Sequence, residues 1–121
     1  MTLAQQPLES HDVHSRRLIQ HAEEMLESGD RLQVSEKAWG AVAHRLKVVA
    51  ESRGLKYETH ADAFRVVHIL ARDEQNPQIR TLFSVAHGLH INYYGDIKTT
   101  DYLRGELEDV KRLLSILERI E

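Results

Sequence analysis

Apolar side chains recur every three or four residues in five successive segments of this chain, and this spacing restricts the possible folds more than any other feature. Residues at such intervals share one face of a helix, whereas a half-buried strand needs strict alternation, which no segment shows. The segments cover residues 11–28, 30–53, 59–72, 76–95 and 99–120. The pattern predicts five amphipathic helices and no sheet.

The ends of these segments carry residues that suit helix termini. Asp30 with Gln33 has the spacing of a capping box, Thr59 with Asp62 has the same spacing, and Thr99 or Thr100 precedes the last segment. Asn76 comes before a proline at a first helical position. Glycines mark the stops: Gly29, Gly54 and Gly95. We therefore expect one all-α domain, a five-helix up-and-down antiparallel bundle over residues 11–121, preceded by a flexible tail of residues 1–10.

Composition excludes several classes of protein. Sixteen Lys and Arg against nineteen Asp and Glu give a net charge of -3, so the chain as a whole has no basic field that would attract nucleic acid. The absence of cysteine excludes disulfides and Cys-ligated zinc, and it fits a reducing compartment. No apolar run approaches the ~20 residues that cross a bilayer, and residues 1–7 do not resemble a signal peptide. We expect a cytoplasmic protein without a membrane segment or cofactor.

The last segment has more apolar side chains than one neighbouring helix can cover. Leu113, Ile116 and Ile120 widen a stripe that already repeats with four-three spacing. A homodimer that buries this stripe is the expected solution. The alternative is a monomer in which the N-terminal tail covers it.

The chain contains eight histidines, an unusual number for its length: His11, His14, His21, His44, His60, His68, His87 and His90. The first three lie along one side of the first segment. No carboxylate joins them in a zinc-ligand pattern such as H-E-x-x-H, so no metal site is predicted there. Solvated or half-buried side chains are the simpler interpretation of these three and of His68.

The second segment and the loop after it carry a local charge of +4, from six basic and two acidic residues. Glu36, Gly40, His44 and Lys47 fall on one arc of this helix, with Lys37 beside them. Such an arc is suited to binding a phosphate or the carboxylates of a partner. The alternative is a solvated face in which the glycine serves helix packing.

In the fourth segment Arg80, His87 and Tyr94 recur every seven residues and form one stripe beside the core face. His90 lies closer to the core, where burial would lower its pKa unless a carboxylate pairs with it. Such an imidazole can act as a base, although a core histidine satisfied by a hydrogen bond is the simpler interpretation. Trp39 shares the apolar face of the second segment and is expected in the core.

Three blocks of the sequence resemble a known superfamily. They are Ser35-Glu36-Lys37-Ala38-Trp39-Gly40-Ala41, Thr59-His60 at a helix start, and Ala86-His87-Gly88-Leu89-His90-Ile91-Asn92-Tyr93-Tyr94. Together they are similar to the HEPN superfamily of helical domains, with the archaeal PaREP-type branch and its bacterial relatives closest. The similarity covers roughly residues 12–118. It implies an up-and-down helical bundle that is usually dimeric.

The resemblance also implies two functions of different class. Many HEPN proteins are metal-independent endoribonucleases, of toxin or RNA-processing type, with four to six residues between an arginine and a following histidine. Arg80 and His87, with six residues between them, have this spacing. Others bind nucleotides or pair with a nucleotidyltransferase partner. In such a ribonuclease a neutral imidazole takes a proton from a ribose hydroxyl while a guanidinium stabilises charge on the phosphate.

We favour the class without catalysis, because Ser84, Val85 and Ala86 stand where an arginine would precede His90. In this interpretation a dimeric binding module accepts a nucleotide or protein partner. The site would be lined by Glu36, Lys37, His60, His87, His90 and Tyr93. The alternative is a ribonuclease that uses Arg80 with His87 or His90. Because the three blocks lie on different helices, the sequence predicts that His60, His87 and His90 gather near Glu36 and Lys37.

Overall fold

A computed structural model describes residues 6–121, and side chains from His11 onward. Its helices are α1 (Gln6–Ser28), α2 (Arg31–Ser52), α3 (His60–Asp73), α4 (Gln78–Gly95) and α5 (Thr100–Arg119). The predicted all-α bundle is confirmed, and the described residues contain no strand. α1 begins five residues before the expected start at His11, so only residues 1–5 of the predicted tail precede it, and these lie outside the described part.

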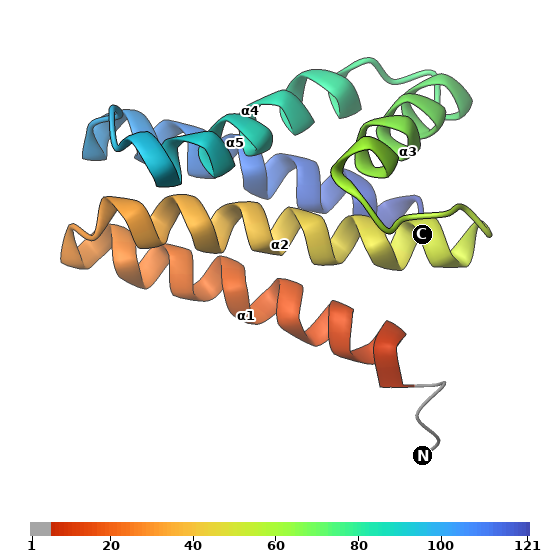
Figure 1. Cartoon of the computed structure of the whole chain (residues 1–121), viewed down its shortest axis with the longest axis horizontal. Coiled ribbons are helices and arrows are strands. Elements are labelled where there is room, and N and C mark those ends of the chain that lie inside the picture. The colour runs from red at the N-terminus through yellow and green to blue at the C-terminus, as the bar shows by residue number, and fades with distance from the viewer. Residues whose placement is uncertain (1–5) are drawn as a thin grey trace.

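α2 lies in the middle of the bundle, with α1 on one side of it and α4 and α5 on the other (Figure 1). α1 and α2 make an antiparallel hairpin, α4 and α5 lie over α2, and the short α3 crosses one end at a tilt (Figure 1). α2 packs against all four other helices. None of the described helices is both long and apolar enough to span a membrane.

Small side chains bring α1 close to α2. A Cβ added at Gly40 would lie 3.0 Å from Cδ1 of Leu18, so this glycine allows close approach of the two helices. Ala38 and Ala41 are fully buried on the same stretch of α2. The packing interpretation of Gly40 is therefore confirmed.

The buried charge of Arg45 was not recognised in the sequence. This α2 residue is only 1% exposed, yet it forms ion pairs with Asp12 on α1 at 2.5 Å, Glu118 on α5 at 3.4 Å, and Glu121. A buried guanidinium is tolerated only where such partners compensate for its lost hydration. The arginine thus ties three parts of the bundle together and contributes little to any basic surface.

The apolar stripe of α5 is covered within the chain by two neighbouring helices, so it is not available for the homodimer contact expected there. Leu113 is 1% exposed and Ile116 is 7% exposed, and Ile120 packs against the same core. The reason is that α5 contacts both α2 and α4, which cover it from two sides. A homodimer is not needed to bury these residues, and the alternative cover by residues 1–10 falls on side chains outside the described part.

Replacing Ile116 with Glu should therefore unfold the protein rather than dissociate a dimer. A carboxylate at this buried position should lower the free energy of unfolding by about 3 kcal/mol or more. Thermal unfolding followed by circular dichroism measures the loss. Ser115→Glu, at the exposed neighbouring position, should change stability little. A folded monomer of wild-type stability from Ile116→Glu would contradict this account.

Candidate functional site

Three histidines from two helices gather around the single tryptophan of the chain. The ring centroids of His60 and His90 are 5.1 Å apart, those of His87 and His90 6.1 Å, and those of His60 and His87 6.2 Å. Each ring also lies 5.2–5.7 Å from Trp39. The prediction that these three histidines converge is confirmed. We call the four residues the histidine–tryptophan cluster.

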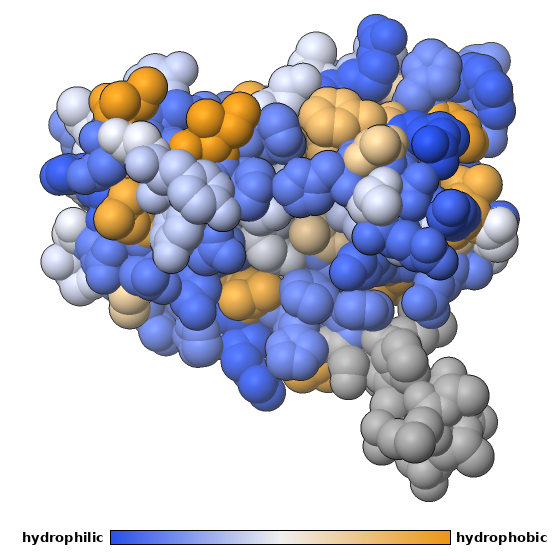
Figure 2. Space-filling view, viewed as in Figure 1, coloured by the Kyte–Doolittle hydropathy of each residue, from blue (hydrophilic) through white to orange (hydrophobic). Residues whose placement is uncertain are grey.

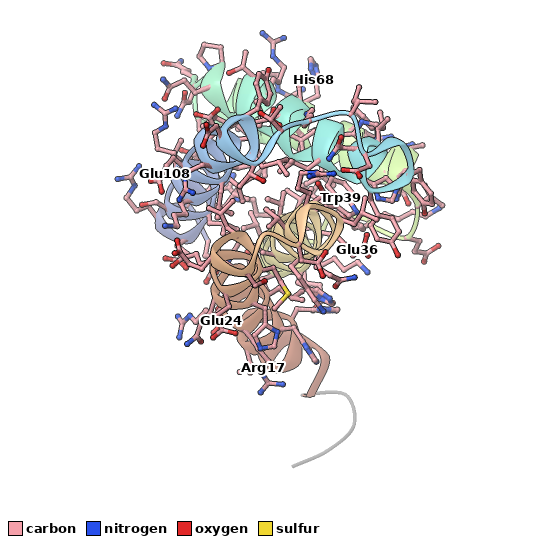
Figure 3. All side chains as sticks on the ribbon, turned by 90° about the vertical axis from the view of Figure 1, so that its left-hand side faces the viewer. Arg17, Glu24, Glu36, Trp39, His68 and Glu108 are labelled. Atoms are coloured by element: carbon pink, nitrogen blue, oxygen red, sulfur yellow. The ribbon has the colours of Figure 1, made fainter. Side chains whose placement is uncertain are left out.

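Local structure explains how each ring reaches the cluster. His60 is the first residue of α3 and lies within the capping box in which Thr59 and Asp62 accept each other's backbone N–H. His87 and His90 lie three residues apart on α4 and so share one side of that helix. Trp39 reaches up from α2 into the space below α4 (Figure 3).

The cluster has a buried floor and a solvent-facing rim. Trp39 is 6% exposed, as expected for a core residue, whereas His60 is exposed and His87 and His90 are half-buried. The histidine rings therefore lie on an apolar base and remain accessible from outside.

Further aromatic rings extend this surface. Phe64 is 47% exposed and lies edge-on to the ring of His87 at 5.0 Å. Tyr94, 76% exposed, lies edge-on to His90 at 5.6 Å, and Tyr93 lies 5.1 Å from Tyr94. The result is a continuous aromatic and imidazole surface across α3 and α4.

Electrostatics favour an uncharged imidazole at His87. Partial burial lowers the pKa of His87, and the neighbouring His90 and His60 lower it further. Nδ1 of His90 is buried and has no hydrogen-bond partner among the described residues. Neutral rings can stack on flat ligands, and an imidazole nitrogen can accept or donate a hydrogen bond.

The two charged residues expected beside the histidines lie differently. Glu36 stands one turn before Trp39 on α2 and near it (Figure 3). Lys37 stands two residues before Trp39, about 160° around the helix axis, and so is turned away from the cluster. Both are half-buried, and no ion pair joins either to another described residue. Only Glu36 remains a candidate for the edge of the cluster.

Arg80 lies apart from the histidines with which it was paired in the sequence. It is exposed in the first turn of α4, where it lines a pocket with His68 and Arg72. His87 lies seven positions farther along α4, about 10 Å along the helix axis. No contact joins Arg80 to His87 or His90 in the described part of the chain. The helix repeat gave these residues one stripe without bringing them together.

The arc on α2 proposed to hold a phosphate is covered by α1, so that hypothesis is wrong. Nδ1 of His44 lies 2.6 Å from Nδ1 of His11, and the ring of His14 stacks on His44 with centroids 5.3 Å apart. Lys47 instead lies over the ring of Tyr57 at 5.4 Å. Nowhere in the described part do three or more His, Asp or Glu side chains form a group able to hold a metal ion.

Comparison of the sequence with known protein families identifies a relationship. The profile described as the archaeal PaREP1/PaREP8 family matches residues 13–114. The chain belongs to this family. The predicted PaREP-type relationship is thereby confirmed, and the match includes every residue of the histidine–tryptophan cluster. Searches of curated proteins and of solved structures gave no match.

The region matched to PaREP1/PaREP8 also contains a buried polar pair whose role the sequence did not reveal. Nδ2 of Asn92 donates to Oγ of Ser35 at 2.9 Å, which joins α4 to α2. Oδ1 of Asn92 accepts from the backbone N–H groups of Ile97 and Lys98 at 3.0 and 3.1 Å. Both side chains are 2% exposed or less. These two motif residues therefore serve structure and lie outside the candidate site.

Asn92→Ala should destabilise the protein strongly. The change leaves a buried hydroxyl and two backbone N–H groups without partners, at a cost of about 2–4 kcal/mol. Urea unfolding of the variant measures this. Ser84→Ala, which removes an exposed hydroxyl on the same helix, is the matched control and should stay within about 0.5 kcal/mol of the wild type. Equal stability of the two variants would show that the Asn92 network is not needed.

Acidification should weaken the contact of α1 with α2. Burial and the neighbouring His11, His14 and Lys47 lower the pKa of His44 from 6.5 to about 4. The unfolded chain therefore binds this proton first, so the free energy of unfolding is highest above pH 6.5 and falls as the pH drops toward 4. The loss should be on the order of 1–2 kcal/mol, because the ring is still partly exposed.

Denaturation of wild type and His44→Leu at pH 7 and at pH 4.5 tests this origin. The leucine variant should show a smaller loss of stability on acidification, because it has no imidazole at this position to protonate. His21→Leu, at a half-buried position on α1 rather than α2, should keep the wild-type pH dependence. The same pH dependence in all three proteins would contradict a role for His44.

Proposed function

We propose that this protein is a non-catalytic nucleotide-binding module in which the histidine–tryptophan cluster receives the base. The observation that carries the proposal is the convergence of three accessible imidazoles on Trp39. The exposed rings of Phe64 and Tyr94 flank this cluster on either side.

The chemistry of the cluster suits a flat heterocycle. Bases stack on aromatic and imidazole rings, and one stacking contact is worth about 1–3 kcal/mol by alanine substitution. Imidazole nitrogens add hydrogen-bonding groups for the edge of a base.

The position of Arg80 supports a binding role over ribonuclease activity. Cleavage through Arg80 with His87 or His90 needs the guanidinium and the imidazole at one phosphate. Arg80 instead lies two helical turns from His87 and in a separate pocket. The lowered pKa of His87 fits a general base and a neutral stacking ring equally well.

The relation to the HEPN superfamily is part of the same proposal. Its support is that all three resembling blocks contribute side chains to one cluster, although they lie on α2, α3 and α4. The proposal also includes a cytoplasmic location and a protein partner. The partner is either a nucleotidyltransferase or a second copy of this chain.

A homodimer contact is proposed at a place other than the α5 stripe. Three large apolar side chains are exposed around the α4–α5 connection: Ile91 is 59% exposed, Ile97 84% and Tyr102 60%. Figure 2 shows apolar patches on this end of the molecule, separated by polar side chains. Exposed apolar groups of this kind are typical of contact surfaces.

Adenosine 5′-monophosphate should change the fluorescence of Trp39, which is the only tryptophan of the chain. His87→Ala should weaken this binding about tenfold, through loss of one stacking contact. His21→Ala, on the opposite layer, is the matched control and should bind as the wild type does. The absence of any fluorescence or histidine NMR response at millimolar nucleotide would refute the proposal.

An activity assay on single-stranded RNA in the presence of chelator separates the two classes of function. We expect no cleavage by the wild type. Cleavage that disappears in His87→Ala and in Arg80→Ala would establish the ribonuclease alternative in its place.

A further inference from the structure

The pocket that Arg80 lines lies where α3 is followed by α4. It has a volume of about 330 Å³ and is lined by His68, Ala71, Arg72, Gln75, Pro77 and Arg80. This volume is at the lower end of the range for small-molecule sites. Figure 3 shows His68 at the outer edge of the molecule, well away from Trp39. We call this the corner pocket.

The corner pocket is electropositive because the nearby carboxylates are engaged elsewhere or are too few. Glu74 forms an ion pair with Arg53 of α2 at 2.7 Å. Asp73 pairs with Nε of Arg72 at 3.0 Å, which leaves the terminal nitrogens of that guanidinium free of this contact. Arg80 has no ion pair with any described residue. Guanidinium groups bind phosphate oxygens through paired hydrogen bonds, and a protonated histidine adds a further donor.

Beside the pocket, Gln75 has a backbone conformation that favours glycine. α1, α2 and α3 all end in the same hydrogen-bonding motif, whose closing residue has a positive φ. In α1 and α2 this residue is Gly29, at φ 80°, and Gly54, at φ 67°. In α3 it is Gln75, at φ 51°. A side chain in this conformation costs about 1 kcal/mol relative to glycine.

The side chain of Gln75 has no structural role that offsets this strain. The other described non-glycine residue with positive φ is Asp96, and its carboxylate forms an ion pair with Arg31 at 3.0 Å. No hydrogen bond joins the amide of Gln75 to another described residue, and Gln75 lines the corner pocket. A strained residue whose side chain faces a cationic pocket is the arrangement expected of a ligand contact.

We propose that the corner pocket binds phosphate groups of the nucleotide whose base lies on the histidine–tryptophan cluster; this inference rests on the proposed function. Arg72 and Arg80 supply the charge, and Gln75 supplies an amide donor. Since about 10 Å of helix separates Arg80 from His87, one phosphate next to the base does not reach the pocket. The ligand is therefore a nucleoside triphosphate or a short oligonucleotide, both of which carry phosphates farther from a base.

The affinities of adenosine mono- and triphosphate and of a triadenylate, measured by Trp39 fluorescence, test the proposal. The wild type should bind at least one of the two longer ligands about tenfold or more tightly than the monophosphate. Tighter binding of the triphosphate indicates a polyphosphate chain, and tighter binding of the triadenylate indicates phosphodiesters. Arg80→Gln should abolish the difference and leave monophosphate affinity unchanged. Arg104→Gln, which removes an exposed arginine on α5, is the matched control and should preserve it.

Gln75→Gly gives an independent readout. Relief of the backbone strain should raise the midpoint of thermal unfolding by about 2–5 °C, while loss of the amide should weaken binding of the longer ligand several-fold. A more stable variant with unchanged affinity would overturn the role of Gln75.

The outcomes separate the two proposals. Equal affinities of the wild type for the three ligands would overturn the corner pocket and leave the base site intact. Binding of inorganic triphosphate can be detected by the NMR signals of His68. If it binds tightly and this binding depends on Arg80, while the monophosphate does not bind, the pocket is established and the base site is refuted.

Discussion

Enclosure of α2 by the four other helices is the constraint on which the rest of the structure depends. It requires small residues where α1 approaches, as at Gly40, and it takes Arg45 out of water. Carboxylates from both α1 and α5 compensate the buried guanidinium. The two helices farthest apart in the sequence are thereby joined through the middle one.

The candidate site is a consequence of this enclosure. Trp39 belongs to the core of α2 and is also the floor under three histidines from α3 and α4. The bond between Ser35 and Asn92 keeps α4 against the same stretch of α2. Trp39 thus couples the stability of the core to the shape of the site, so its substitution would alter both. The histidines at the rim can instead be changed one at a time.

Helical geometry predicted which side chains share one face of a helix, but not which of them lie close together in the fold. The convergence of His60, His87 and His90 followed from three sequence blocks on different helices, and the structure bears it out. Lys37 failed the corresponding expectation because it lies on the opposite side of α2 from Trp39. Arg80 shares a stripe with His87, but a stripe two turns long places its ends in different surroundings.

The sequence by itself determined five helices, their ends apart from the start of α1, and their all-α packing, because helical periodicity and capping are local properties of consecutive residues. Only the tertiary structure decided which neighbour covers each face. The Gly40–His44 side of α2 was available to a ligand until α1 was seen to lie over it, and the stripe of α5 was in excess until α2 and α4 were seen to bury it. Periodicity reports the orientation of side chains about one axis, whereas exposure depends on the distances between axes, which no single segment encodes.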